Sequence, residues 1–357
     1  MTSFQEYIAA LPDGNQRQYQ LLEPLLVPIM PYLLDPDVSE IFVVSPRDIR
    51  YRIRGVDHVS DGSSFKEGDL RSLLEQIGTF NQRDLGFDAD RGQRPILEGS
   101  LPCGSRCSGA LKGINVDDDC LTIRKHNKSM LTPDDLVKLG SITREALEWL
   151  RRRIVEDNMS VLISGSTDSG KTTFLNVISN YLPDEHRILV CEDTPELKIN
   201  KPHVVRFQTA PAAGVSFVDL LDLCMRQTGD HIVFGEIRAG QQSNGRMTGS
   251  PAYPFAMALN SGHLASMTTI HANGREESLN KFVDYCFFSG VPNVPERMFR
   301  KLVGHAFQIV VQLVKDRSTG RKICQSISLS EGFNEERECF RMRDVFAFEK
   351  GVLQFIQ

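Results

Sequence analysis

Hydrophobic residues in the first third of the chain either alternate with polar ones or recur with helical spacing. In the stretch 49–55, Ile49, Tyr51 and Ile53 alternate with arginines, which is typical of a half-buried strand. The stretch 66–81 places its aliphatic side chains on one face of a helix. The expected elements are strands over 38–45, 49–55 and 120–126, a helix over 66–81, and two strands joined by a glycine-rich turn within 94–113. Together they predict a small α+β domain over residues 1–126.

From about residue 142 the pattern changes to short apolar runs that alternate with helical periodicity. This alternation predicts an α/β fold built on a largely parallel sheet. The stretch 127–141 is polar and contains Pro133, so we expect a linker there and a C-terminal domain over 142–357. The expected elements are strands over 159–165, 186–193, 231–237 and 265–272, and helices that start after residue 170, at Ser216 and at residue 275.

Composition argues against several classes of protein. A net charge of −5 argues against a protein that coats nucleic acid, and we expect no sequence-specific nucleic-acid binding. The start of the chain lacks the features of a signal peptide, and the longest apolar stretch, 21–34, is too short and too interrupted to span a bilayer. The eight cysteines lack framework or zinc spacing, so we expect reduced thiols, several of them in the core. These features favour a cytoplasmic protein.

The stretch "GSTDSGKT" at 165–172 follows a predicted strand and precedes a predicted helix, which is the context of a phosphate-binding loop. Glycines let backbone N–H groups point at phosphates, and the helix N-terminus attracts negative charge. Lys171 is suited to neutralise phosphate oxygens, and the Thr172 hydroxyl is suited to bind Mg²⁺. The alternative is a glycine-rich turn with a chance lysine. The candidate nucleotide contacts are Gly165, Ser166, Thr167, Asp168, Ser169, Gly170, Lys171, Thr172 and Thr173.

Asp168 is the unusual residue of this loop, because it places a carboxylate where phosphate oxygens are expected. Aspartate tolerates the left-handed backbone that such a position can require. Its charge would repel a phosphate charge at ~6 Å by about 3 kcal/mol, at an effective dielectric constant near 20 and before screening. A side chain turned to solvent, or the charges of Lys171 and Mg²⁺, would offset much of this repulsion. We therefore expect weakened or faster-exchanging nucleotide rather than a site that binds none.

Three further polar residues end predicted strands of the same domain. Glu236 ends the strand in "VFGEIR", where a carboxylate can hold Mg²⁺ through water or polarise the attacking water. Glu192 lies in "CEDTPEL", where it can act as general base for water. His271 ends the strand in "TTIHA", where it can sense the γ-phosphate. Each residue alone fits an ordinary strand end equally well or better, and only their order and spacing together favour a catalytic site.

The combination resembles the secretion ATPase superfamily, which powers type II secretion, type IV pili and type IV secretion. The loop at 165–172 is similar to its Walker A motif, "CEDTPEL" to its aspartate box, "FGEIR" to its Walker B motif, and "SGH" with "TTIHA" to its histidine box. The resemblance covers almost the whole chain and is strongest to the hexameric Vir-type traffic ATPase of type IV secretion. It implies a RecA-like P-loop ATPase domain behind a smaller N-terminal domain.

The resemblance also extends to the N-terminal domain. "LPCGSRCSG" and "LTIRKH" resemble family segments whose arginines reach the nucleotide phosphates, which implies this role for Arg106 and Arg124. A guanidinium group suits the role because it stays charged and grips phosphate with two hydrogen bonds. In the family the nucleotide sits between the two domains. The alternative for each residue is a surface arginine on a hairpin.

The sequence departs from the family pattern at three places. Asp168 replaces the usual glycine, and Gly229 replaces a residue that is generally proline. About ten extra residues, rich in Gly, Ser and Pro, separate the Walker B motif from the histidine box, and we expect them to form a surface excursion.

The resemblance implies a Mg²⁺-dependent ATPase that forms a homohexamer on the cytoplasmic face of a bacterial inner membrane. Its partners would be inner-membrane components of a secretion system, and its association with the membrane would be peripheral. Two alternatives remain. One is a nucleotide-dependent docking component with little turnover, which Asp168 keeps open, and the other is an assembly motor for pili or type II secretion.

Overall fold

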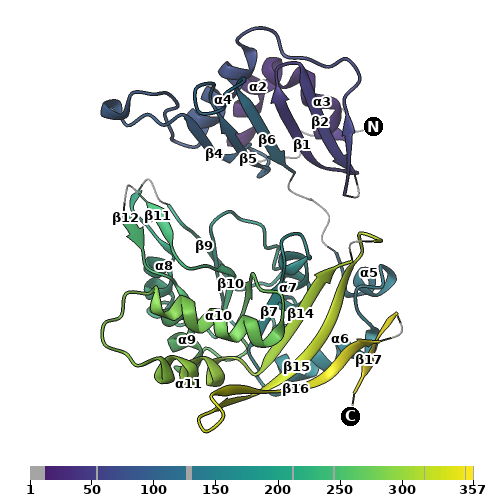
Figure 1. The fold of residues 1–357 in the computed structure, drawn as a ribbon, viewed down its shortest axis with the longest axis vertical. Coiled ribbons are helices and arrows are strands. Elements are labelled where there is room, and N and C mark those ends of the chain that lie inside the picture. The colour runs from purple at the N-terminus through teal and green to yellow at the C-terminus, as the bar shows by residue number, and fades with distance from the viewer. Residues whose placement is uncertain are drawn as a thin grey trace. The chain divides into compact units, whose positions relative to one another are not determined.

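The chain forms two compact units, Met1–Ser129 (unit 1) and Met130–Gln357 (unit 2), in the computed structural model (Figure 1). The structure describes residues 13–53, 55–125, 131–210, 213–243, 246–316, 318–349 and 351–356. Residues 1–12 and 126–130 lie outside this range. Most of the N-terminal stretch that lacks the features of a signal peptide therefore lies outside the described residues. So does the junction between the strand expected over 120–126 and the expected linker.

Unit 1 is an antiparallel sheet with the strand order β3-β2-β1-β6-β5-β4. Its strands are β1 (Val38–Ser45), β2 (Asp48–Ile53), β3 (Val56–Val59), β4 (Ile96–Ser100), β5 (Arg106–Ala110) and β6 (Cys120–Arg124). Its helices are α2 (Asp13–Leu26), α3 (Met30–Leu34) and α4 (Asp69–Phe80), with short 3-10 turns η1 (Val27–Ile29) and η2 (Ala89–Arg91). The helices cover one face of the sheet (Figure 1). The strands and the helix predicted for this part of the chain are confirmed.

Alternation along the strands decides which face of the unit 1 sheet is buried. Ile41 and Val43 of β1, with Ile123 of β6, are at most 1% exposed and pack in one core with the apolar side of α4. Burial of such side chains stabilises the unit by roughly 1.5–3 kcal/mol each. The alternate residues, such as Phe42 and Thr122, lie on the opposite face, which is only partly buried.

Unit 2 is built on a sheet with the strand order β17-β16-β15-β14-β7-β13-β10-β8-β9, in which β14 through β9 are parallel and β15 to β17 extend the sheet antiparallel. Its strands are β7 (Val161–Gly165), β8 (Ile188–Glu192), β9 (Val204–Gln208), β10 (His231–Ile237), β13 (Met267–Ile270), β14 (Ile309–Lys315), β15 (Lys322–Asn334), β16 (Cys339–Glu349) and β17 (Val352–Phe355). Its helices are α5 (Pro133–Lys138), α6 (Arg144–Val155), α7 (Lys171–Ser179), α8 (Phe217–Cys224), α9 (Ala252–Asn260), α10 (Arg275–Phe287) and α11 (Glu296–Ala306).

The parallel strands of unit 2 are buried on both faces. Val161 and Ile163 of β7 belong to the core shared with α6 and α7, and Leu162 belongs to the core shared with α8 to α11. Figure 1 shows these helix groups on opposite sides of the sheet. Continuous apolar strands of this kind are typical of parallel sheets, which explains why the strands of this part could be predicted from short apolar runs.

Part of the expected linker is helical. Thr132 and Asp135 form a capping box, with each side chain bonded to the backbone N–H of the other residue, and Pro133 occupies the first turn of α5. Leu136 of this helix is buried in the core of unit 2. Residues 133–138 therefore fold with unit 2, because a capped turn with one apolar anchor can pack against α6.

The extra residues after β10 form a short antiparallel hairpin, β11 (Gln241–Ser243) with β12 (Arg246–Thr248). Serine hydroxyls fix the end of the excursion. The Ser250 Oγ donates to the Arg238 carbonyl at 2.7 Å, and the Ser289 Oγ donates to the Ser250 carbonyl at 2.7 Å. The excursion thus leaves the core after β10, and the chain re-enters the core at the start of α9.

The helix expected to start at Ser216 is α8, and a capping box formed by Ser216 and Asp219 begins it. The Ser216 Oγ accepts a hydrogen bond from the Asp219 N–H, and the Asp219 carboxylate accepts one from the Ser216 N–H. We expect Ser216→Ala to lower the free energy of unfolding of unit 2 by about 1 kcal/mol. The single tryptophan, Trp149 of α6, reports on unit 2 alone, so its fluorescence during urea unfolding measures the effect. Ser39→Ala in unit 1 is the control, and an unchanged midpoint for Ser216→Ala would contradict the role of this cap.

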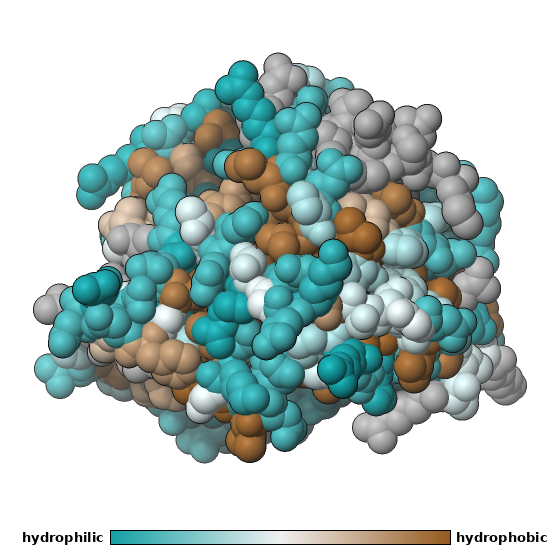
Figure 2. All heavy atoms as spheres, turned by 90° about the horizontal axis from the view of Figure 1, so that it is seen from above, coloured by the Kyte–Doolittle hydropathy of each residue, from teal (hydrophilic) through white to brown (hydrophobic). Residues whose placement is uncertain are grey.

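The surface is mixed in character. Hydrophilic side chains surround smaller groups of hydrophobic ones on the face seen in Figure 2. Among the described residues, no helix is both long enough and apolar enough to cross a membrane. The expectation that several cysteines lie in the core is confirmed. The buried ones are Cys107, Cys191, Cys224, Cys286 and Cys324.

Candidate nucleotide site

The phosphate loop connects the end of β7 to the start of α7, as predicted. Asp168 and Gly170 adopt left-handed backbone conformations, with φ of 61° and 91°. A Cβ on Gly165 would lie 2.6 Å from the Leu313 carbonyl oxygen, so only glycine fits where the loop leaves the sheet. Among the residues that the structure describes, no side chain caps the N-terminus of α7. The first N–H groups of this helix therefore point into the loop, which suits phosphate oxygens.

Lys171 opens α7 and turns back over the loop. Its Nζ donates to the carbonyls of Gly165 and Ser166 at 3.0 and 3.1 Å, and it lies 3.9 Å from the Glu236 Oε1. The side chain is only 9% exposed, so its charge acts in a partly dehydrated environment. Thr172 and Thr173 follow in the first turn of the helix.

Glu236 near the end of β10 is paired on both of its oxygens. Lys171 lies near its Oε1, and the Arg238 Nε and Nη2 donate to its Oε2 at 2.9 and 2.8 Å. Arg238 was not among the predicted site residues. Its spacing of two from Glu236 is the only signal in the sequence, because residues two apart on an extended chain share one face.

Glu192 ends β8 and is 4% exposed. Its Oε1 accepts the backbone N–H groups of Glu196 and Leu197, both at 2.8 Å. Burial raises the pKa of Glu192 to about 7, although these two hydrogen bonds oppose the shift. A carboxylate with a pKa near neutrality is suited to general-base catalysis.

Close contacts tie the strand ends to one another. The Thr269 Oγ1 of β13 donates to the Gly235 carbonyl of β10 at 2.8 Å. A Cβ on Gly235 would lie 3.6 Å from the Glu192 Cγ, so Glu192 lies beside the residue that precedes Glu236. Because the strands are parallel and neighbouring, their carboxyl ends meet at one edge of the sheet.

His271 follows β13 at the same edge. Its Nδ1 lies 3.5 Å from the Thr167 Oγ1 of the phosphate loop. Burial, followed by the charge of Lys171, lowers the pKa of His271, which favours the neutral imidazole. The structure thus brings Lys171, Glu192, Glu236 and His271 together at one edge of the unit 2 sheet.

Asp168 is paired with two lysines. Its two carboxylate oxygens accept hydrogen bonds from the Lys315 and Lys322 ammonium groups, each at 2.6 Å. Partial burial raises the pKa of Asp168, but these lysines outweigh it and hold the pKa below its usual value. The charge of Asp168 was expected to be offset by Lys171 and Mg²⁺. Lys315 and Lys322 also offset it, and the sequence pattern did not reveal these two partners.

Arg106 and Arg124 belong to unit 1, where they are directly opposite residues of β5 and β6. Glu40 of β1 is the next residue across the sheet from Arg124. Arg52 and Glu40 form an ion pair, so this acid already has a cationic partner. The two arginines thus lie side by side on one face of the unit 1 sheet.

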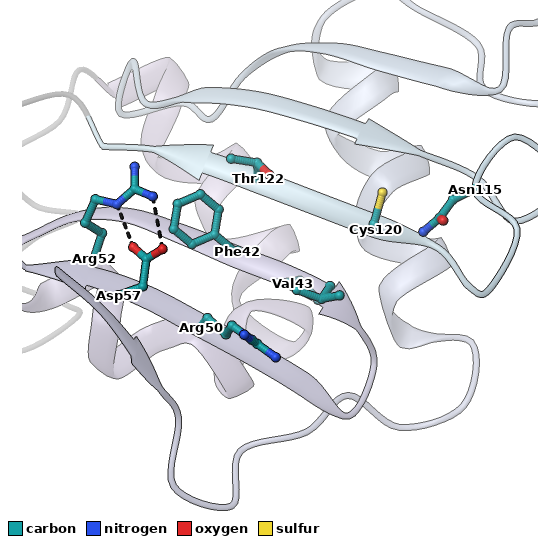
Figure 3. Close-up of a pocket in the computed structure, with 9 residues that line it drawn as sticks. Phe42, Val43, Arg50, Arg52, Asp57, Asn115, Cys120 and Thr122 are labelled. Atoms are coloured by element: carbon teal, nitrogen blue, oxygen red, sulfur yellow. Dashed lines mark hydrogen bonds and ion pairs between the residues drawn. The ribbon is translucent and has the colours of Figure 1, made fainter. Parts of the chain in front are cut away.

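The same face carries a hollow of about 540 Å³ over β1, β2 and β6 (Figure 3). Its arginines are neutralised within the unit, because Arg52 binds Asp57 through two hydrogen bonds and Arg50 binds Asp48 in the same way. The Arg52 guanidinium also lies 4.8 Å from the centre of the Phe42 ring. We assign no ligand to this hollow.

The residues of unit 2 fit a nucleoside triphosphate with Mg²⁺. The phosphate loop offers glycine positions that a Cβ would fill, uncapped helix N–H groups and a lysine. Among the described residues, no group of three or more His, Cys, Asp or Glu side chains is placed to hold a metal ion by itself. Mg²⁺ commonly takes only one or two protein ligands and completes its shell with phosphate oxygens and water, which Thr172 and Glu236 would allow.

Comparison with solved structures shows the fold. The structure entitled "Pilus Retraction Motor PilT and Bound ADP" matches with a TM-score of 0.57 at 17% identity, covering 93% of this chain and 83% of that one. The Legionella pneumophila ATPase DotB matches with a TM-score of 0.53 at 17% identity, covering 91% and 82%. These matches confirm the predicted α/β fold.

Comparison with other sequences shows the family. The conjugal transfer protein TrbB of Rhizobium radiobacter is 30% identical over 70% of this chain and 72% of its own length. PtlH, a type IV secretion system protein of Bordetella pertussis (strain Tohama I), is 28% identical over 82% and 89%. An uncharacterized Methanocaldococcus jannaschii protein is 34% identical over 61% of this chain, which spans only 30% of that relative. Residues 101–336 match the family described as "Type II/IV secretion system protein", and the chain belongs to this family, as the resemblance had indicated.

Proposed function

We propose that this chain is a Mg²⁺-dependent ATPase. The observation that carries the proposal is the meeting of the phosphate loop, Glu192, Glu236 and His271 at one edge of the unit 2 sheet. A triphosphate seated in the loop would have a lysine for its phosphate charge and a near-neutral carboxylate for the attacking water within the same edge.

The residues have distinct roles in this proposal. The phosphate loop and Lys171 bind and orient the phosphates, and Thr172 with Glu236 would hold Mg²⁺, which supplies charge neutralisation when bound. Glu192 takes a proton from water as the water oxygen attacks the γ-phosphorus and the bond to the ADP oxygen breaks. His271 contacts the loop at Thr167 and would report the presence of the γ-phosphate.

The chain's place in a larger assembly is part of the same proposal. We propose that it forms a homohexamer on the cytoplasmic face of a bacterial inner membrane and energises type IV secretion through inner-membrane components. The names of the relatives PtlH and TrbB associate those proteins with type IV secretion and conjugal transfer, which supports this choice. Arg106 and Arg124 of unit 1 would be further contacts of the phosphates, the role that the resemblance implies for them.

One experiment tests the reaction and the assembly together. Purified chain is incubated with ATP and Mg²⁺, phosphate release is measured, and the particle mass is determined by light scattering under the same conditions. We expect phosphate release that stops when EDTA removes Mg²⁺, and a mass of six chains. Absence of release would contradict the enzymatic proposal, and a monomeric mass with full release would contradict the hexamer alone.

A further inference from the structure

The contact between Asp168 and two lysines links the phosphate loop to the distant end of the β14–β15 pair. Lys315 is the last residue of β14, and Lys322 is the first residue of β15. The two lysines are directly opposite each other in the antiparallel register. Each ammonium group binds a different oxygen of Asp168 at 2.6 Å, so one carboxylate has two cations.

The lysines are held against the loop by the fold of unit 2. Leu313, two residues before Lys315, pairs with Gly165 at the start of the loop. The stem of Lys322 lies over Gly170, since a Cβ on Gly170 would be 3.3 Å from the Lys322 Cδ. Both lysines therefore approach the loop from the paired ends of β14 and β15, and the stem of Lys322 packs over the backbone of the loop.

The charges explain what this arrangement does. A lone carboxylate in the loop would repel the phosphates that the loop's N–H groups attract. With two ammonium groups at hydrogen-bond distance, each carboxylate oxygen of Asp168 is bound to a cation, so that its negative charge is offset within the loop. All three side chains are 32–45% exposed, so dissolved salt screens the cluster beyond a Debye length of about 8–10 Å but screens it less at the range of a phosphate in the same loop.

We propose that Lys315 and Lys322 are positioning residues of the nucleotide site, which neutralise Asp168 and hold its carboxylate away from bound phosphate. This inference rests on the proposed nucleotide-binding function. If the inference is right, the loop can bind phosphate although it carries Asp168. The effect of each lysine on nucleotide affinity then depends on the charge of residue 168. If the lysines instead bound phosphate directly, their effect would be the same whether or not residue 168 carries a charge.

A double-mutant cycle separates these two cases. The probe is a fluorescent ADP analogue, titrated with Mg²⁺ into the full chain, and the dissociation rate is measured by chasing with unlabelled ADP. Lys315→Met with Lys322→Met keeps the aliphatic stems and removes the charges, and we expect it to weaken binding at least about tenfold. Asp168→Asn, which tolerates the same left-handed backbone, should change binding by less than about threefold.

The decisive variant combines all three substitutions. Because no carboxylate is left to neutralise, we expect its affinity to lie within about threefold of Asp168→Asn alone, so that Asp168→Asn rescues the loss caused by the lysine substitutions. A loss of affinity that persists in the Asn background would overturn the proposal. The two single lysine variants, with thermal unfolding of every variant, keep the test valid if the double variant is unstable.

A matched control comes from α11. Lys301 has a side-chain exposure of 45%, equal to that of Lys322, and it pairs with Glu335 at 2.5 Å. Lys301→Met should leave nucleotide affinity unchanged. If the unaltered chain binds no nucleotide, the proposed function itself fails. If the unaltered chain binds but the lysine variants bind equally well, only the present inference fails.

Discussion

Replacing Glu192 by glutamine is expected to lower ATP turnover by about 10²–10⁴-fold, the usual contribution of a positioned general base. Glutamine keeps the shape and can still accept the N–H groups of Glu196 and Leu197, but it cannot take a proton from water. Nucleotide binding should therefore remain. The measurement is steady-state phosphate release, with titration of a fluorescent ADP analogue as the test of binding.

The expected pH dependence of turnover by the unaltered chain follows from the same residue. Burial raises the pKa of Glu192 to about 7, and only the carboxylate form can accept the proton. Turnover should fall as the pH is lowered through about 7. Stability has the opposite dependence, because a raised carboxyl pKa favours the protonated folded state below pH 4.5 and this contribution is lost as the pH rises to about 7. Glu192→Gln, which is always neutral, should thus be more stable than the unaltered chain at pH 8, by up to about 3 kcal/mol.

Glu196→Gln provides the control for both effects. The charge of Glu196 contributes to the raised pKa of Glu192, so its removal should move the pH profile of turnover slightly downward without a large loss of rate. Full turnover in Glu192→Gln would exclude this residue as the base. An unchanged pH profile in Glu196→Gln would instead contradict the contribution of the Glu196 charge to the raised pKa of Glu192.

The parts of the site that could be predicted are those defined by local sequence. The phosphate loop lies between a strand and a helix as expected, because its glycines and its strand–helix context lie within one short segment. The capping box at Ser216 and strand β1 over Val38–Ser45 were found for the same reason. Neighbouring parallel strands then bring residues from different segments to one edge, so four local motifs were enough to indicate a common site.

The partners of these residues could not be predicted in the same way. Lys315 and Lys322 lie 147 and 154 residues after Asp168, and nothing in their own segment marks them. Only the pairing of β14 with β7 and of β15 with β14 brings them to the loop. The helical start of unit 1 was also missed, since Pro24 and the later prolines of 21–34 interrupt the pattern while α2, η1 and α3 continue through it.

Replacing Glu236 by glutamine is expected to lower turnover by about 10–100-fold, the usual cost of losing a carboxylate that holds a metal through water. The neutral amide attracts Mg²⁺ less, and it also leaves Lys171 and Arg238 without their shared carboxylate. The loss should be largest at low Mg²⁺ and partly recover at high Mg²⁺. Phosphate release measured against Mg²⁺ concentration tests this expectation.

The Mg²⁺ dependence distinguishes a metal-holding role of Glu236 from a structural one. If Glu236 only neutralised Lys171 and Arg238, the variant would lose turnover equally at every Mg²⁺ concentration. Glu276, an exposed acid in the first turn of α10, supplies the control, and Glu276→Gln should leave both the rate and the Mg²⁺ requirement unchanged. Glu236 is the only predicted metal ligand in unit 2 that carries a negative charge, so its loss should be felt if the assignment is right. Turnover of Glu236→Gln equal to that of the unaltered chain would therefore contradict the role of Glu236 in holding Mg²⁺.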